Sequence, residues 1–273
     1  MRGYHVFFIV LAVSLAVQVW IWKVDTLTDE SIWVQRLQYF AADVRTGHFQ
    51  QLHYSAHPGL PSFWAALPFQ MLGMSPENSL EISVIILVSL LGAGMATVAY
   101  SILPHSWWWV TVAGITILHP LYVQSSVANA IAGPAAALGL LCLLLLEKRP
   151  TARTAAILGI SFGVSLLSHF SISLLVVLPV IFFIFYRHGR RLGSMAALTT
   201  AAVFTLLNPL FLENPLEHFR FNFRYVSLHT YVLGVARLGT EDIFLISPFA
   251  ALGFFVGIVT AFTGRPIVSL PRD

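Results

Sequence analysis

Charged residues and cysteine are both scarce in this sequence. Asp, Glu, Lys and Arg together make up 10% of the 273 residues, against about 25% in a typical soluble domain. This scarcity excludes an ordinary soluble globular protein. The one cysteine, Cys142, lies in an apolar run, so the chain has neither a disulfide framework nor a cysteine-based metal site.

The basic residues are few and do not form one continuous face. The formal net charge is only +3, and no row of Lys and Arg could follow a phosphate backbone, so we expect no nucleic-acid partner. Apolar residues, in contrast, make up 57% of the chain, at a mean hydropathy of +0.79. We therefore predict an all-α integral membrane protein with membrane lipids around it.

Apolar runs in the sequence predict about eight transmembrane helices. The first, residues 4–22, follows a basic start and lacks a small-residue cleavage pattern, so we interpret residues 1–22 as an uncleaved signal anchor. The other runs are residues 79–103, 107–121, 124–146, 153–168, 170–186, 192–211 and 243–263.

Residues 58–73 decide how the helices are oriented. This segment contains three prolines and would be about 24 Å long as a helix, whereas the hydrocarbon core is about 30 Å thick. If it does not span, the basic loops 147–153 and 187–191 both face the cytosol, as the positive-inside rule requires. We therefore expect 58–73 to lie on the outer surface of the cell membrane and both termini to be cytosolic.

The first outer loop, residues 23–78, begins with a helical pattern. Apolar positions recur at helical spacing from residue 29 to about residue 46, and Gly47 is a suitable stop. We predict two interfacial helices in this loop, this one and 58–73. The apolar positions are Trp33, Leu37, Phe40 and Val44, whereas Gln35, Arg36, Gln38 and Asp43 fall elsewhere.

The whole chain, 1–273, is expected to be one polytopic membrane domain. Residues 79–211 would form the transmembrane bundle, 212–242 a second outer loop, and 243–263 the last transmembrane helix. No repeat, low-complexity linker or soluble domain interrupts this pattern.

Under this topology the acidic residues gather on the outer face. All of the 12 Asp and Glu residues except Glu147 and Asp273 fall there. The second outer loop adds basic residues interleaved with phenylalanines, among them His218, Arg220 and Arg224. Such a surface suits a reaction between a polar acceptor and a lipid-linked phosphate, because Arg binds phosphate and a carboxylate can accept the acceptor's proton.

The segments "TDESIWVQRLQYF" (28–40) and "HPGLPSFWAALPFQMLG" (57–73) resemble the first outer loop of the GT-C superfamily of membrane glycosyltransferases. The most similar groups are the dolichyl-phosphate-mannose-protein mannosyltransferases and the bacterial lipid A aminoarabinose transferases. In them an Asp-Glu pair follows the first span, and a His-Pro-Pro or Pro-Pro element opens a second surface helix. "NPLFLENPLEHF" (208–219) and "HTYVLG" (229–234) extend the resemblance to about residue 240.

The resemblance implies a glycosyltransferase of the outer face. It would move a sugar from an undecaprenyl- or dolichyl-phosphate donor to a hydroxyl of a lipid, protein or glycan acceptor, with inversion. Asp29 would be the general base and Glu30 its neighbour. The donor phosphate or the loop around it would be bound by Arg36, His57, Pro58, His218, Arg220 and Arg224.

Three departures from the family pattern accompany the resemblance. Gly59 stands where many relatives have a second proline, and the next span opens with "ENSLEIS" (77–83), which has no basic residue. The family usually continues for several more spans, so the resemblance implies that a C-terminal part is lacking. No metal-ligand motif is complete, and a divalent metal ion is left open as an aid to the departing phosphate.

Other interpretations of the same residues remain. Acids in a first helical turn also complement the helix dipole, and arginines near a membrane also reach lipid headgroups. A non-catalytic lipid-binding subunit or a remnant of a longer enzyme would keep the same scaffold. A transporter or flippase is disfavoured because transporters place ionisable residues within their spans, whereas the predicted spans carry essentially none in their interiors.

Overall fold

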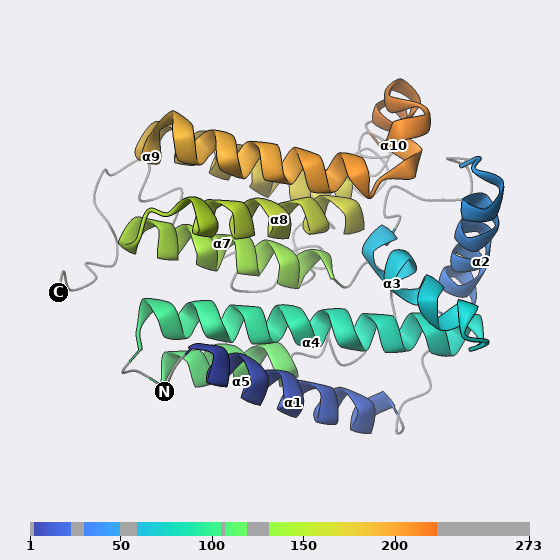
Figure 1. Ribbon diagram of the computed structural model, residues 1–273, viewed down its shortest axis with the longest axis horizontal. Coiled ribbons are helices and arrows are strands. Elements are labelled where there is room, and N and C mark those ends of the chain that lie inside the picture. The colour runs from blue at the N-terminus through green and yellow to red at the C-terminus, as the bar shows by residue number, and fades with distance from the viewer. Residues whose placement is uncertain (1–2, 23–29, 50–58, 105–106, 119–130, 223–273) are drawn as a thin grey trace, which may run out of the picture.

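The computed structural model describes residues 3–22, 30–49, 59–104, 107–118 and 131–222, and these ranges are almost entirely helical (Figure 1). None of them contains a strand, so the all-α prediction is confirmed for this part of the chain. The helices are α1 (Gly3–Trp22), α2 (Glu30–Thr46), α3 (Leu60–Met71), α4 (Pro76–Ile102), α5 (Trp108–Leu118), α7 (Ala132–Lys148), α8 (Ala152–Ser168), α9 (Phe170–Leu206) and α10 (Pro209–Glu213).

Three of the described helices are long and apolar enough to cross a membrane. They are Gly3–Trp20 within α1, Pro76–Ile102 and Ser173–Leu206 within α9, the last of which is divided by a turn at Gly189, while Ala152–Ser168 is a shorter apolar helix. These lengths indicate a membrane protein. The predicted count of eight spans stays a prediction: α5 has 11 residues and α7 has 17, against the roughly 20 of a standard span, and 243–263 lies outside the described residues.

Helix α9 is a hairpin of two antiparallel arms that turns at Gly189. In a single straight helix, Phe170 and Phe204 would be about 51 Å apart at 1.5 Å per residue, yet their ring centroids are separated by 5.4 Å. Gly189 has φ 82° and ψ 174°, a conformation open essentially to glycine alone. The turn falls within the predicted loop 187–191. We call residues 170–188 the first arm and 190–206 the second arm.

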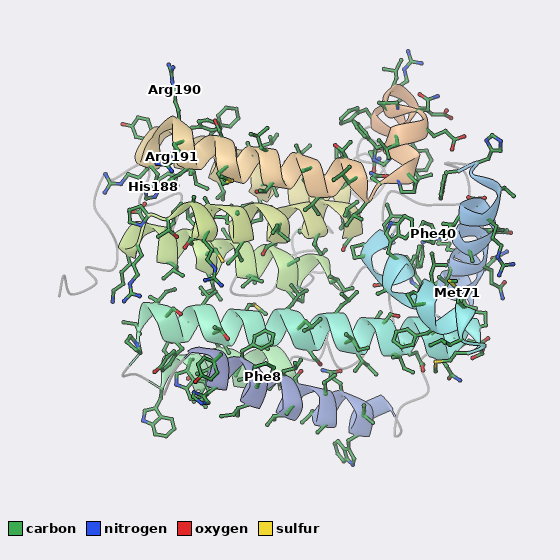
Figure 2. All side chains as sticks on the ribbon, in the orientation of Figure 1. Phe8, Phe40, Met71, His188, Arg190 and Arg191 are labelled. Carbon is green, nitrogen blue, oxygen red and sulfur yellow. The ribbon has the colours of Figure 1, made fainter. Side chains whose placement is uncertain are left out.

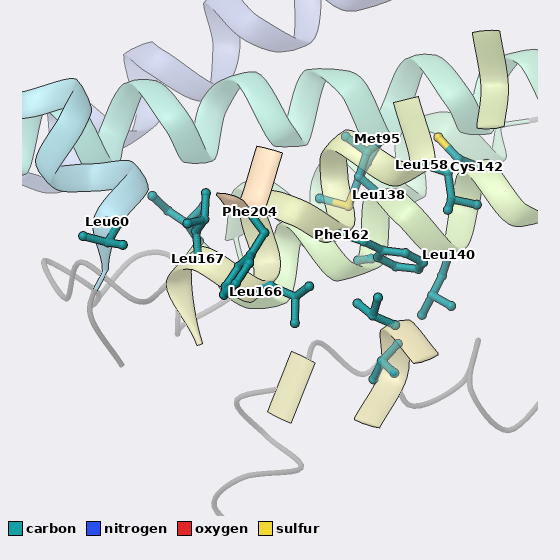
Figure 3. Close-up of a cluster of buried hydrophobic side chains, with 14 of the residues drawn as sticks. Leu60, Met95, Leu138, Leu140, Cys142, Leu158, Phe162, Leu166, Leu167 and Phe204 are labelled. Carbon is teal, nitrogen blue, oxygen red and sulfur yellow. The ribbon is translucent and has the colours of Figure 1, made fainter. Parts of the chain in front are cut away.

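The bundle is built on both sides of α4 (Figure 1). On one side α1 and α5 pack against it through small and β-branched residues, including Val6, Val10, Ala93 and Ala96. On the other side lie α7, α8 and α9, whose buried leucines and phenylalanines form the larger core, with Phe162 fully buried at its centre (Figure 3). Apolar packing of this kind leaves few places for polar groups.

Buried serines join the helices where polar groups do occur. Ser14 of α1 donates a hydrogen bond to Ser89 of α4 at 3.0 Å. Ser165 donates to the Ala132 carbonyl at 2.9 Å, and Ser173 donates to the Ser165 carbonyl at 2.9 Å. Interhelical hydrogen bonds of this type stabilise helix association in an apolar medium.

Helices α2 and α3 lie at one end of the bundle, where α2 runs across the ends of the long helices (Figure 1). The predicted apolar face of α2 is confirmed, since Leu37 and Phe40 are fully buried and Trp33 is nearly so. Gly47 ends α2 with φ 73° and donates its N–H to the Asp43 carbonyl at 2.8 Å. Asp43, which falls off the predicted apolar face, is nevertheless only 7% exposed, so the covered face of α2 is wider than its apolar residues mark.

Helix α3 is short because of its glycine and prolines. Gly59 precedes it with φ 62°, Pro61 lies in its first turn and Pro68 lies inside it. Twelve residues give a helix about 18 Å long, so α3 is too short to cross a bilayer core. Its buried face, with Leu60, Phe63 and Ala66, packs onto the core of the bundle.

Charge is divided between the two ends of the bundle. The basic end contains residues 147–153 and 187–191, with six Lys and Arg residues, one histidine and one acid. These loops meet there, because Glu147 contacts His188 at 3.1 Å and Arg187 at 3.7 Å. The C-terminus of α4 lies at the same end, since Lys148 Nζ donates to the Ile102 carbonyl at 3.0 Å. The opposite, acidic end is formed by α2, α3, α10 and the start of α4, and carries Asp43, Glu77, Glu81, Glu213 and Glu217.

Candidate functional site at the acidic end

Half of the predicted site lies outside the described residues, namely Asp29, His57, Pro58 and Arg224. Glu30 is described as the first residue of α2, which is where the sequence predicted it. Arg36, His218 and Arg220 are described together with their surroundings. All of these described residues belong to the acidic end of the bundle (Figure 1).

The end of α2 is tied directly to α10. The backbone N–H of Phe49 donates a hydrogen bond to the Glu213 carboxylate, across 164 residues of sequence. The other carboxylate oxygen lies 3.7 Å from His48 Nδ1. Glu213 therefore joins the first predicted outer loop to the second, although sequence analysis assigned it no specific role.

A second bond joins α3 to the same corner. Trp64 Nε1 donates to the Leu207 carbonyl at 2.9 Å, and Leu207 follows the last residue of α9. This bond satisfies a carbonyl that would otherwise have no partner at a helix end. The first predicted outer loop is thus tied both to α10, through Glu213, and to the end of the second arm of α9, through Leu207.

Aromatic side chains of α2, α3 and Phe49 pack against one another at this end of the bundle. Phe40 of α2 lies against Trp64 with ring centroids 4.9 Å apart and planes at 90°, and against Phe63 at 5.6 Å. Phe49 is 6.0 Å from Phe40. The edge-to-face contact of Phe40 with Trp64 adds to the stabilisation from burial alone, and the contacts of Phe40 with Trp64 and Phe63 hold α2 and α3 together.

Arg36 lies over an aromatic ring. Its guanidinium carbon is 4.7 Å from the centroid of Trp33, a cation–π geometry, and its side chain is half-buried. Arg220 is exposed. Arg36 and Arg220 are thus cations at the same end of the molecule as Glu30.

His218 is buried in an aromatic cluster. Its ring centroid is within 6.4 Å of the rings of four phenylalanines, and only 2% of the residue is exposed. Burial lowers the pKa of His218 from 6.5 to about 4, because the charged imidazolium would lose its hydration. His218 is therefore neutral near pH 7 and does not act as a cationic phosphate ligand in this conformation. The phenylalanines are Phe170, Phe204, Phe211 and Phe219.

Two asparagines determine which ring nitrogen of His218 carries the proton. Asn208 Oδ1 accepts a hydrogen bond from the Phe211 N–H at 3.2 Å, so its amide nitrogen is the group that faces His218 Nε2 at 3.3 Å. Asn222 Nδ2 also lies 3.3 Å from Nε2 and donates to the His218 carbonyl at 2.8 Å. Because Nε2 accepts, the neutral ring carries its proton on Nδ1. The Asn208 bond ties residues 215–222 to the start of α10, and the ring contacts of His218 with Phe170 and Phe204 hold them on the hairpin of α9.

The Asn-Pro pairs at 208–209 and 214–215 are the sequence signal from which the two short helices after α9 could have been predicted. Asn208 caps α10, and Asn214 caps helical residues 215–222 by accepting from the Glu217 N–H at 3.1 Å. The sequence analysis located the second outer loop here but did not predict these helices. Asn followed by Pro at the first helical position is a recognisable helix start.

No group of three His, Cys, Asp or Glu side chains within the described ranges is placed to hold a metal ion. Comparison of the chain with family models, curated proteins and solved structures gives no match. The functional argument therefore rests on the residues themselves and their arrangement.

Proposed function

We propose that this protein is a membrane glycosyltransferase of GT-C type that uses a polyprenyl-phosphate sugar. The observation that carries the proposal is the joining of its two predicted outer loops at Glu213. The carboxylates expected to accept a proton and the arginines expected to bind phosphate belong to those two loops. A transferase needs a proton-accepting carboxylate and phosphate-binding cations around the same bound donor and acceptor. Correct positioning of these reactants supplies much of the rate enhancement.

The proposed chemistry divides the work between an acid–base group and cations. Asp29 removes the proton from the acceptor hydroxyl as that oxygen attacks the anomeric carbon of the sugar. The bond between the anomeric carbon and the phosphate oxygen breaks, and the electron pair leaves with the lipid phosphate. Arg36 and Arg220, with Arg224, stabilise the charge on the phosphate. Glu30, His57 and Pro58 complete the loop around the donor.

The topology belongs to the same proposal. Eight spans with both termini in the cytosol place the basic end inside, in agreement with the positive-inside rule. The acidic end, with α2 and α3, then lies at the outer surface, where a lipid-linked donor is accessible. The charge division between the two ends of the bundle supports this orientation.

The test is sugar transfer from a panel of radiolabelled polyprenyl-phosphate monosaccharides by the purified chain in nanodiscs. We expect turnover by the wild type and a loss of roughly 10²- to 10⁴-fold in Asp29→Asn, as for removal of a general base. Asp25→Asn is the matched control, because it makes the same change four residues earlier in the same loop. Equal activity in the wild type and Asp29→Asn would remove Asp29 from the role of base.

The non-catalytic alternative gives a different result in the same experiment. A lipid-binding subunit or remnant would bind polyprenyl phosphate without transferring sugar from any donor. Binding is measured separately, by retention of labelled polyprenyl phosphate on the purified protein. Retention without turnover would overturn the transferase proposal and support the binding protein.

A further inference from the structure

The basic end of the bundle carries two arginines with no role in the proposed reaction. Arg190 and Arg191 open the second arm of α9, immediately after the turn at Gly189, and both are exposed (Figure 2). They lie at the opposite end of the molecule from α2, α3 and α10. Any function for them is therefore separate from the candidate site.

The one carboxylate among the two basic loops is already engaged. Glu147 contacts His188 through one oxygen and Arg187 through the other. Within the described ranges, no ion pair joins Arg190 or Arg191 to a carboxylate. The positive charge of this turn is thus not neutralised by the described protein groups, and an anionic ligand would complement it.

An exposed apolar row leads along the first arm to the same turn. Leu175, Leu178, Phe182 and Tyr186 follow one another at helical spacing and are 71%, 46%, 69% and 90% exposed. Spacing of three or four residues places them on one face of the arm. An exposed apolar row that ends in a tyrosine three residues before the turn matches an acyl chain that leads to a phosphate headgroup.

We infer that the α9 turn is a binding site for an anionic phospholipid. The lipid phosphate contacts Arg190 and Arg191, and one acyl chain lies along the row from Leu175 to Tyr186. The N-terminus of the second arm adds the positive end of a helix dipole to the same place. Both the phosphate and the acyl chain make contacts in this site, so free phosphate alone would not be its ligand.

The experiment measures the binding of phosphatidylglycerol and phosphatidylcholine to the purified full chain in detergent by native mass spectrometry. We expect the wild type to prefer phosphatidylglycerol. Arg190→Gln/Arg191→Gln should weaken its binding by roughly 30-fold, because each basic side chain near an anionic lipid contributes about fivefold. Lys23→Gln/Arg45→Gln removes the same charge from the first predicted outer loop, at residues with no role in the proposed reaction, and should leave the preference intact.

Two further comparisons make the test specific. Arg190→Lys/Arg191→Lys keeps the charge and should retain most of the preference, so it distinguishes lost electrostatics from a disturbed turn. Inorganic phosphate should not displace the lipid. An equal loss in both glutamine pairs, no lipid preference in the wild type, or displacement by inorganic phosphate would each overturn the assignment.

Discussion

The backbone N–H of Phe49 and the carboxylate of Glu213 form the bond that connects the two predicted outer loops. Phe49 follows the glycine that ends α2, and Glu213 is the last residue of α10. The bond therefore holds the first loop against the corner where α9 ends. Its partners are separated by 164 residues, so the contact depends on the whole bundle being folded.

Loss of the Glu213 carboxylate should release the segment after α2. In Glu213→Ala we expect the amide of Phe49 to exchange with solvent roughly tenfold faster, which corresponds to about 1.5 kcal/mol, the lower end for a hydrogen bond to a charged group. Hydrogen–deuterium exchange of the peptide that contains residues 47–49 measures the effect. Glu217→Ala is the control, because Glu217 lies four residues later and contacts Asn214 rather than α2. Unchanged protection in Glu213→Ala would show that the bond does not hold the segment.

Acid should destabilise the protein through His218. The folded-state pKa of about 4 lies below the ordinary value of 6.5, so the unfolded chain binds a proton that the folded chain excludes. The stabilisation by neutral His218 is complete above pH 6.5 and is lost as the pH falls toward 4, with an upper limit of about 3 kcal/mol.

Thermal unfolding of wild type and His218→Gln across this pH range measures the contribution. We expect the wild type to lose more stability on acidification, because glutamine can accept the Asn208 bond but does not titrate there. Parallel curves for wild type and His218→Gln would exclude His218 as the source.

The turn of α9 should depend on the absence of a side chain at Gly189. An added Cβ would meet no atom within 4 Å, so Gly189→Ala tests the backbone conformation alone. We expect a loss of about 1–3 kcal/mol in the free energy of unfolding, since φ 82° with ψ 174° is unfavourable for alanine.

Gly114→Ala is the matched control for Gly189→Ala. Gly114 lies in helical α5, and a Cβ there also meets no atom within 4 Å. Because alanine is favoured over glycine inside a helix, this variant should be as stable as the wild type or slightly more so. A similar loss in both variants would point to a general effect of adding a methyl group.

The sequence predicted the features that depend on local pattern. The spacing of Leu37 and Phe40 located the buried face of α2, Gly47 located its end, and residues 187–191 located the turn of α9. Each follows from residue periodicity or from the conformational freedom of glycine, which act within a few residues.

The features that the sequence did not predict depend on distant partners. Asp43 is buried because other elements cover α2, and Glu213 and His218 acquire partners only when α10 folds back onto the hairpin. The predicted span 192–211 was also too long at its C-terminal end, because Asn208 starts a new helix there. Asp29, His57, Pro58 and Arg224 lie outside the described residues, so their predicted roles stay predictions.

The unequal ends of the bundle also have a consequence for its insertion. A membrane that carries a voltage changes the energy of each elementary charge moved across it by roughly 2.3 kcal/mol per 100 mV. With six Lys and Arg residues and one acid in the loops at one end and a surplus of acids at the other, the two possible orientations differ in energy in an energised bilayer. A negative interior potential would draw the arginine-rich loops inward and would oppose inversion of the protein after synthesis.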